Sequence, residues 1–119
     1  MKPGELVPNI VVEDAAGHPR PLWEFRQRSH VVLLAARSVD KDFVAAWKAE
    51  AERRKKTLDW LNAAMLFTHE ERDDDFRGVL LIDRYGRFHT ALPPPVKSAI
   101  EETFNRIENE FIYYEARHC

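Results

Sequence analysis

The residues best placed to do chemistry follow a short apolar run at residues 31–35 of this 119-residue chain. Polar side chains crowd the next positions, and a helical pattern begins at Phe43. A helix N-terminus favours an anion, because free N–H groups and the positive end of the helix dipole meet there. The candidate anion-binding residues are Arg37, Ser38, Asp40 and Lys41. Since no glycine-rich phosphate loop is present, the simpler alternative is that Asp40 or Ser38 only caps the helix.

An acidic segment at residues 70–75, next to His69, is the second candidate for chemistry. Carboxylate oxygens are ligands that calcium and magnesium prefer in proteins. The spacing matches no EF-hand loop, however, and consecutive aspartate side chains point apart. We therefore expect a solvated loop, paired in places with Arg72 and Arg77, and we predict no metal site.

The remaining reactive side chains form no catalytic or metal-binding motif. The five histidines are scattered, so His-Glu-x-x-His does not occur, and there is no Gly-x-Ser-x-Gly elbow. Cys119 is the only cysteine and follows a predicted helix, whose C-terminal end has the wrong dipole sign to stabilise a thiolate. We predict no catalytic residue and no cofactor, and we expect Cys119 at most to form an intermolecular disulfide on oxidation.

The overall composition argues against several classes of partner. Lys and Arg number 18 against 20 Asp and Glu, which gives a net charge of -2 and no basic excess to attract nucleic acid. The N-terminal segment lacks the apolar stretch of a signal peptide, and no run approaches the roughly 20 apolar residues of a membrane span. Together with the single cysteine, these features favour a soluble cytoplasmic protein of one domain.

The spacing of apolar residues predicts a small α/β domain. Residues 30–36 are apolar at both parities, which is typical of a strand that is buried on both faces. The expected strands are residues 30–36, 63–69, 78–83 and 87–92, and the expected helices are residues 40–56 and 96–114. Residues 1–29, with a short strand at 9–14 and a turn at Gly17, are expected to form an N-terminal hairpin or extension of the core at 30–119.

The loop at residues 70–77 fixes the expected order of the strands. Eight residues are too few for a crossover helix, but they can span the roughly 10 Å that separates two strands with a third between them. The strand at 78–83 is then antiparallel to the first two. The sequence therefore predicts a βαβ unit followed by a hairpin and a helix, in which two helices cover a mixed four-stranded sheet.

Three segments, in this order, resemble the peroxiredoxin-like branch of the thioredoxin superfamily. The N-terminal segment is similar to the branch's Gly-x-x-x-Pro start with a later glycine, and the matching residues are Gly4, Pro8, Ile10, Asp14, Gly17 and Leu22. Residues 31–43 resemble the strand and turn that lead to the family's reactive cysteine. Residues 78–89 resemble its hairpin, and the matching residues are Leu81, Ile82, Asp83, Gly86 and Arg87. The resemblance implies a thioredoxin-like fold and, from the family alone, a thiol-dependent oxidoreductase.

The departures from the family pattern concern the residues that carry its chemistry. Asp40 and Phe43 stand roughly where the family's two cysteines would be, and Gly78 stands nearest to its cis-proline. An oxidoreductase of this type needs an activated thiolate. We therefore expect a redox-inactive domain that binds a protein or associates with itself, and we keep peroxiredoxin-like activity and small-anion binding as alternatives.

The last predicted helix contains the best signal for an interface. Four large apolar residues follow one another, and they are Phe111, Ile112, Tyr113 and Tyr114. One helix face cannot bury all four, and surplus aromatic side chains are typical of protein interfaces. The alternative is that both sides of the helix pack within the domain. Trp60 and Tyr85 are further candidates for exposed aromatic side chains.

Overall fold

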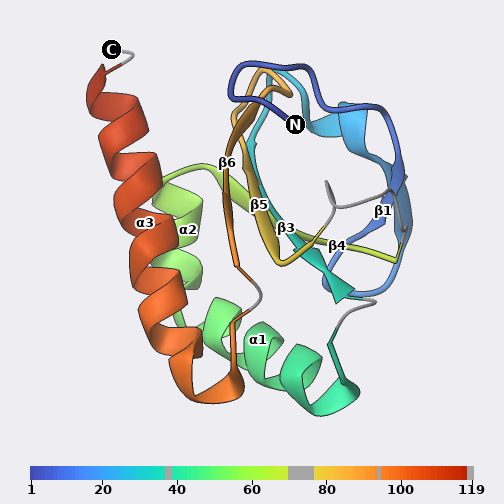
Figure 1. Cartoon of the computed structure of the whole chain (residues 1–119), viewed down its shortest axis with the longest axis vertical. Coiled ribbons are helices and arrows are strands. Elements are labelled where there is room, and N and C mark those ends of the chain that lie inside the picture. The colour runs from blue at the N-terminus through green and yellow to red at the C-terminus, as the bar shows by residue number, and fades with distance from the viewer. Residues whose placement is uncertain (37–38, 70–76, 94, 118–119) are drawn as a thin grey trace.

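A computed structural model describes residues 1–36, 39–69, 77–93 and 95–117, and its elements form an α/β domain (Figure 1). The strands are β1 (Val11–Glu13), β2 (Pro19–Pro21), β3 (His30–Ala35), β4 (Ala63–Thr68), β5 (Val79–Ile82) and β6 (Phe88–Leu92). The helices are η1 (Leu22–Phe25), α1 (Lys41–Arg53), α2 (Lys55–Trp60), η3 (Lys97–Ala99) and α3 (Ile100–Arg117), where η1 and η3 are single 3-10 turns.

The described strands form one mixed sheet in the order β2-β1-β4-β3-β5-β6. β3 is central; it pairs in parallel with β4 and antiparallel with β5, which in turn pairs antiparallel with β6. The arrangement predicted from the eight-residue loop is confirmed, because β5 does lie on the far side of β3 from β4. The predicted N-terminal hairpin is present as β1 and β2, and because β1 pairs with β4, the four predicted strands are part of a six-stranded sheet.

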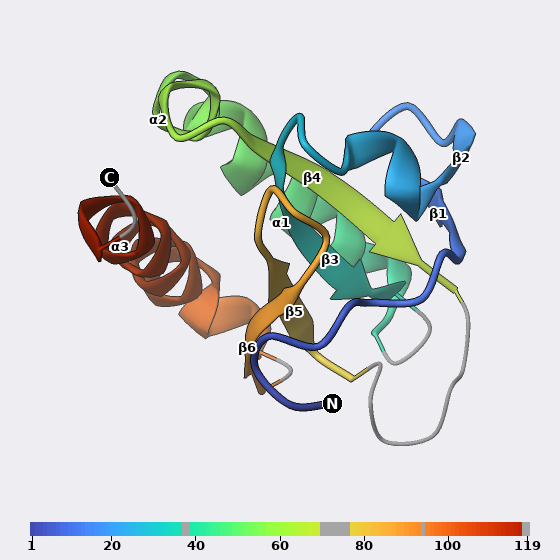
Figure 2. The same ribbon diagram turned by 90° about the horizontal axis from the view of Figure 1, so that it is seen from above.

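The three described α-helices pack on the same face of the sheet, where Trp47 of α1, Leu58 of α2 and Phe104 of α3 belong to one apolar cluster (Figure 2). The prediction of two helices was wrong, because the first helical segment breaks at Arg54, whose backbone leaves the helical region (φ -101, ψ 14), and continues as α2. The start of the last helix was also misplaced. Val96 was expected in its apolar stripe, but it precedes the 3-10 turn η3 and is 65% exposed.

Two apolar clusters lie on opposite faces of the sheet. The larger one, between the sheet and the helices, contains Trp47 of α1 and Phe104, Ile107 and Phe111 of α3, all 0% exposed. The smaller cluster lies under residues 1–29 and contains Val7, Ile10, Val12 and Leu22. The N-terminal segment therefore takes the place of a helical layer on that face, and it belongs to the same core as the rest of the domain.

The hairpin between β5 and β6 is held by the aspartate of the matching motif. The Asp83 carboxylate accepts hydrogen bonds from the backbone N–H groups of Tyr85 (2.9 Å) and Arg87 (3.0 Å). Gly86 has a φ of +79, and a Cβ atom there would lie only 2.6 Å from the Arg26 side chain. The glycine is thus required both by the backbone conformation and by the close approach of the N-terminal segment.

Candidate functional site

The turn between β3 and α1 lies at the carboxyl end of the two parallel strands, where ligands of open α/β sheets usually bind. Asp40 is the N-cap of α1, and its side chain accepts a hydrogen bond of 2.7 Å from the N–H of Phe43. The Phe43 side chain is buried beside Trp47, with 6.0 Å between the ring centroids. The capping prediction is confirmed for Asp40, whereas Arg37 and Ser38 lie outside the described residues.

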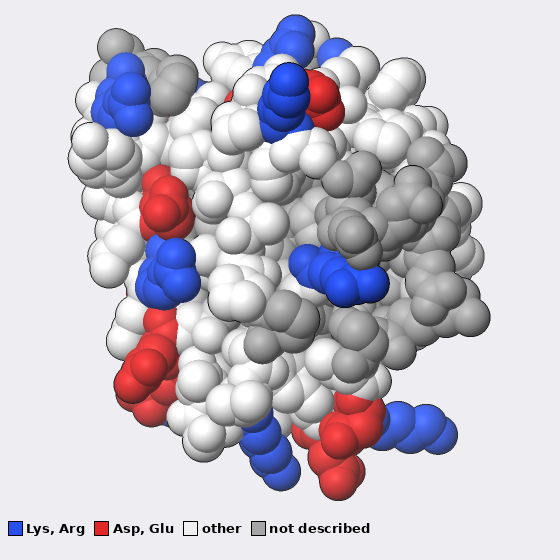
Figure 3. All heavy atoms as spheres, in the orientation of Figure 1, with Lys and Arg blue, Asp and Glu red and all other residues white. Residues whose placement is uncertain are grey.

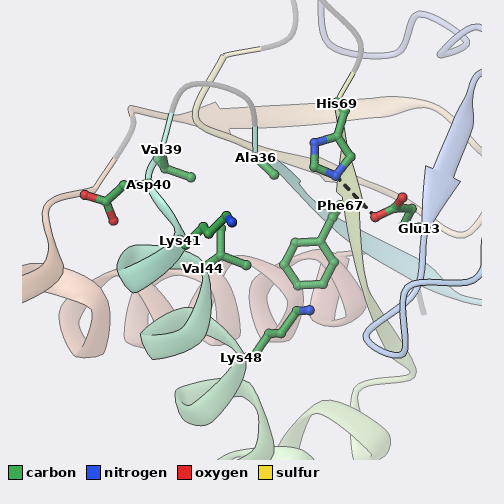
Figure 4. Close-up of a pocket in the computed structure, with 9 residues that line it drawn as sticks. All are labelled: Glu13, Ala36, Val39, Asp40, Lys41, Val44, Lys48, Phe67 and His69. Carbon is green, nitrogen blue, oxygen red and sulfur yellow. Dashed lines mark hydrogen bonds and ion pairs between the residues drawn. The ribbon is translucent and has the colours of Figure 1, made fainter.

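A cavity of about 250 Å³ opens beside this turn (Figure 4). Phe67 of β4 forms one wall, and the ammonium group of Lys48 lies 5.1 Å from the centroid of its ring. Lys41, from the first turn of α1, lines the cavity as well. On the opposite side, the Nε2 atom of His69 lies 3.2 Å from a carboxylate oxygen of Glu13.

The charges around this cavity are mixed. Two lysines line it from α1, while Asp40 and Glu13, which pairs with His69, bring carboxylates. Lys41, Lys48 and the N-terminus of α1 would attract an anion. However, the Asp40 carboxylate is itself negative and already accepts a hydrogen bond from one of the free N–H groups of that helix. Small-anion binding at the 37–42 turn stays a prediction.

A second polar cluster, at the opposite end of the sheet, joins α3 to the strands. His30 begins β3 and is 0% exposed, and its Nε2 atom lies 2.6 Å from Oε1 of Glu115 in α3. The backbone N–H of Arg84 donates to Nδ1 of His30 at 3.1 Å. Because Nδ1 accepts a hydrogen bond, the proton of the neutral ring is on Nε2 and is donated to Glu115.

The titration of this cluster is governed by burial. Desolvation lowers the pKa of His30, although the hydrogen bond to Glu115 opposes that effect. Desolvation and the neighbouring Asp83 carboxylate raise the pKa of Tyr114 to about 12, and the Tyr114 hydroxyl donates to Asp83 at 3.2 Å. His30 is therefore neutral and Tyr114 protonated near pH 7. The cluster attaches α3 to the sheet, and it could not be predicted because His30 and Glu115 are 85 residues apart in the chain.

The four consecutive apolar residues of α3 lie on two different sides of the helix. Phe111 is 0% and Tyr114 5% exposed, so both are part of the core, and their inclusion in the predicted interface was wrong. Ile112 is 44% and Tyr113 61% exposed, with the Arg117 guanidinium 5.5 Å from the Tyr113 ring centroid. We refer to Ile112 and Tyr113 as the outer α3 face.

The other residues predicted from the sequence are distributed as follows. Trp60 (76%) and Tyr85 (48%) are exposed, as predicted. His69 directly follows β4 and His89 lies in β6, which is not adjacent to β4, and His89 pairs with Glu110 at 3.0 Å. The described residues contain no group of side chains that could hold a metal ion. They also contain no cis peptide bond, so Gly78, which stands nearest to the position of the family's cis-proline, follows a trans bond. The acidic residues 70–75 and Cys119 lie outside the described residues.

The face of the molecule seen in Figure 3 carries charges of both signs. On the side seen in Figure 3, described basic and acidic side chains are scattered singly or in small groups, and neither sign forms a continuous patch. Among the described helices, none combines the length and apolar composition needed to cross a membrane.

Comparison with known proteins identifies the fold. No family model matches the chain, and no curated protein matches it. Among solved structures, it is similar to a cysteine-to-serine mutant of PrxQ from Xylella fastidiosa (TM-score 0.66, 11% identity, covering 92% of this chain and 96% of that one). It is also similar to the mitochondrial 2-Cys peroxiredoxin of Plasmodium falciparum (TM-score 0.63, 12% identity, covering 97% and 96%).

A third similar structure is a proposed protein disulfide isomerase from Bacteroides thetaiotaomicron (TM-score 0.58, 15% identity, covering 98% and 94%). The chain therefore has a thioredoxin-like fold, which confirms the fold expected from the sequence.

Proposed function

We propose that this protein is a redox-inactive thioredoxin-like domain that functions by binding protein. The observation that carries the proposal is the identity of the residues at the turn between β3 and α1. Residues 36–43 contain no cysteine, and the two residues nearest to the family's cysteine positions have structural roles: Asp40 caps α1 and Phe43 is buried. A carboxylate and a phenyl ring cannot exchange electrons with a disulfide or a peroxide.

The outer α3 face supports the binding part of the proposal. Ile112 and Tyr113 are large, adjacent and exposed, and they project from a helix whose other side is anchored in the core by Phe104, Ile107 and Phe111. A rigidly held aromatic side chain is the type of residue that contributes most at protein interfaces. The cytoplasmic location and the absence of nucleic-acid and membrane partners, expected from the sequence, remain part of this proposal.

The redox-inactive character can be tested directly. We expect no hydrogen peroxide consumption above the buffer rate when the protein is supplied with a thiol reductant, and the same result for Cys119→Ser. The reason is that Cys119 is the only sulfur nucleophile in the chain. Turnover by the wild type that disappears in Cys119→Ser would establish the peroxiredoxin-like alternative and refute the proposal.

The binding surface can be tested with one substitution. A negative charge in the middle of an apolar contact should weaken it strongly, so Tyr113→Glu is expected to lower partner affinity by about thirtyfold, the effect of losing a residue worth about 2 kcal/mol. Partners recovered from a native lysate by the wild type would be quantified against this variant. Val96→Glu is the matched control, since Val96 is exposed to a similar extent (65% against 61% for Tyr113) but lies before α3. Equal recovery by all three proteins would contradict binding at the outer α3 face.

A further inference from the structure

Within the sheet, one side of β4 is paired with a neighbouring strand along only part of its length. β1 pairs with β4 at one position among the described residues, Glu13 opposite Phe67, and then turns away into the hairpin. The first four residues of β4, Ala63–Leu66, consequently have no neighbouring strand on that side within the described part of the chain. We refer to these residues as the open β4 edge. A groove of about 330 Å³ follows this edge; it is lined by β4, by the helices α1 and α2, and by Ala15 of the turn between β1 and β2.

The other edges of the sheet are protected against further strands, whereas no strand of the described residues covers this one. β2, at one outer edge, has proline at two of its three positions, which cannot donate to a strand ladder. At the other outer edge, residues 4–6 pair with the start of β6 through hydrogen bonds between Gly4, Glu5 and Phe88. The open β4 edge has neither proline nor charge, and Ala63, Ala64 and Met65 are half-buried. Native proteins rarely leave such an edge without a partner.

The charges along the groove have an order that points to one partner. Four charged side chains from α1 and α2 line it, and in chain order they are Lys48, Glu52, Lys55 and Asp59. Lys48 lies at the Phe67 end of β4, since its ammonium group is 5.1 Å from that ring. Asp59 lies at the Ala63 end, where it lines a neighbouring cavity together with Asn62 and Ala63. The sign of the charge therefore alternates from one end of the open edge to the other.

We propose that the open β4 edge pairs antiparallel with the same edge of a second copy of this chain about a twofold axis. In an antiparallel pair, the four charged residues of the second copy run in the opposite direction to those of the first. Lys48 then lies beside Asp59 of the second copy, and Glu52 lies beside its Lys55, so that every lysine faces a carboxylate. A parallel arrangement would place like charges together. Pairing of Ala63–Leu66 in this way satisfies the free backbone groups of both edges and joins the two sheets into one.

This inference rests on the proposed binding function and specifies self-association as one form of it. It leaves the outer α3 face free for a different protein.

Sedimentation velocity over a concentration series, extended into the millimolar range, tests the proposal with exposed charge reversals. The wild type is expected to form a dimer. Lys48→Glu and Asp59→Lys should each weaken dimerisation by about tenfold or more, because each creates two like-charge contacts across the twofold axis. The double variant, Lys48→Glu with Asp59→Lys, restores opposite charges and should recover the dimer. All four residues of the row are exposed, so the variants are expected to fold, and circular dichroism would verify this.

Backbone amide exchange gives a second, independent measurement. Dimer formation should slow exchange at residues within Ala63–Leu66 as the concentration rises, and Tyr113→Glu should leave this unchanged. A wild type that stays monomeric at every concentration overturns the proposal and leaves the edge to a foreign extended segment. A dimer that withstands both single reversals, or that dissociates in Tyr113→Glu, also overturns it. None of these outcomes depends on the peroxide assay, so the two proposals can fail separately.

Discussion

Replacing Trp47 with alanine is expected to lower the free energy of unfolding by about 3–5 kcal/mol. Trp47 is 0% exposed and connects three elements: its ring centroid lies 4.5 Å from that of Phe104 in α3, and its Nε1 atom lies 3.1 Å from the sulfur of Met65 in β4. Since a domain of this size has a total stability of about 5–15 kcal/mol, the loss is a large fraction of it. Urea denaturation followed by far-ultraviolet circular dichroism would measure the change.

Trp60→Ala is the matched control for this experiment, because it removes the same side chain from a position that is 76% exposed. It should change the free energy of unfolding by no more than about 0.5 kcal/mol. If the two variants were equally stable, the larger apolar cluster would not be the main source of stability, and the packing of α1 between β4 and α3 would be wrong.

The part of the fold that the sequence predicted well is the part with strong local patterns. The segments at residues 30–36 and 78–83 are apolar at consecutive positions, whereas a half-buried strand alternates apolar and polar residues. Their central position in the sheet could therefore be predicted. The short loop before β5 then fixed the strand order, because a crossover helix could not fit. These arguments use only apolar periodicity and chain length, and both are properties of neighbouring residues.

The details that were not predicted depend on contacts between distant residues. An N-terminal hairpin was expected, but its pairing with β4 was not, because β1 and β2 have only three residues each and β2 reads Pro-Arg-Pro, which is a poor strand sequence. They form strands because β1 meets Phe67 of β4 and because Leu22 and Val12 fill the smaller apolar cluster. The break at Arg54 was missed for a similar reason: this residue is held by carboxylates from two helices, and the local sequence still reads as helical.

In the candidate site, too, local contacts could be predicted and long-range contacts could not. A cap is a local contact, so Asp40 could be assigned from its place before the helix. The open β4 edge could not be predicted, since it exists only because β1 turns away after a single pairing position. The absence of a thiol at the turn was visible in the sequence, but the structure adds that Asp40 and Phe43 already have structural roles there. The functional hypothesis thus moves from the turn to surfaces elsewhere on the domain.

Replacing Arg54 with methionine is expected to cost about 2–3 kcal/mol of unfolding free energy, because it leaves carboxylates without their main partner. Arg54 donates to Glu50 (2.5 Å), Asn105 (2.8 Å) and Glu108 (3.2 Å), and so ties α1 to α3. Although desolvation opposes it, hydrogen bonding to Glu50 and Glu108 raises the pKa of Arg54, as expected for a cation stabilised by its surroundings. Glu50 is 7% exposed and would keep only Arg53 as a partner.

Arg53→Met provides the comparison, since Arg53 contacts the same Glu50 carboxylate at 2.9 Å but its side chain is 72% exposed. Methionine keeps most of the apolar stem in both variants, so the difference between them reports the charged contacts rather than lost packing. Exposed ion pairs contribute little, and Arg53→Met should cost less than about 1 kcal/mol in the same urea titration. Equal losses in the two variants would mean that the bridge from Arg54 to Asn105 and Glu108 does not hold the helices together, and that α3 is attached to the domain mainly through Phe104, Ile107 and Phe111.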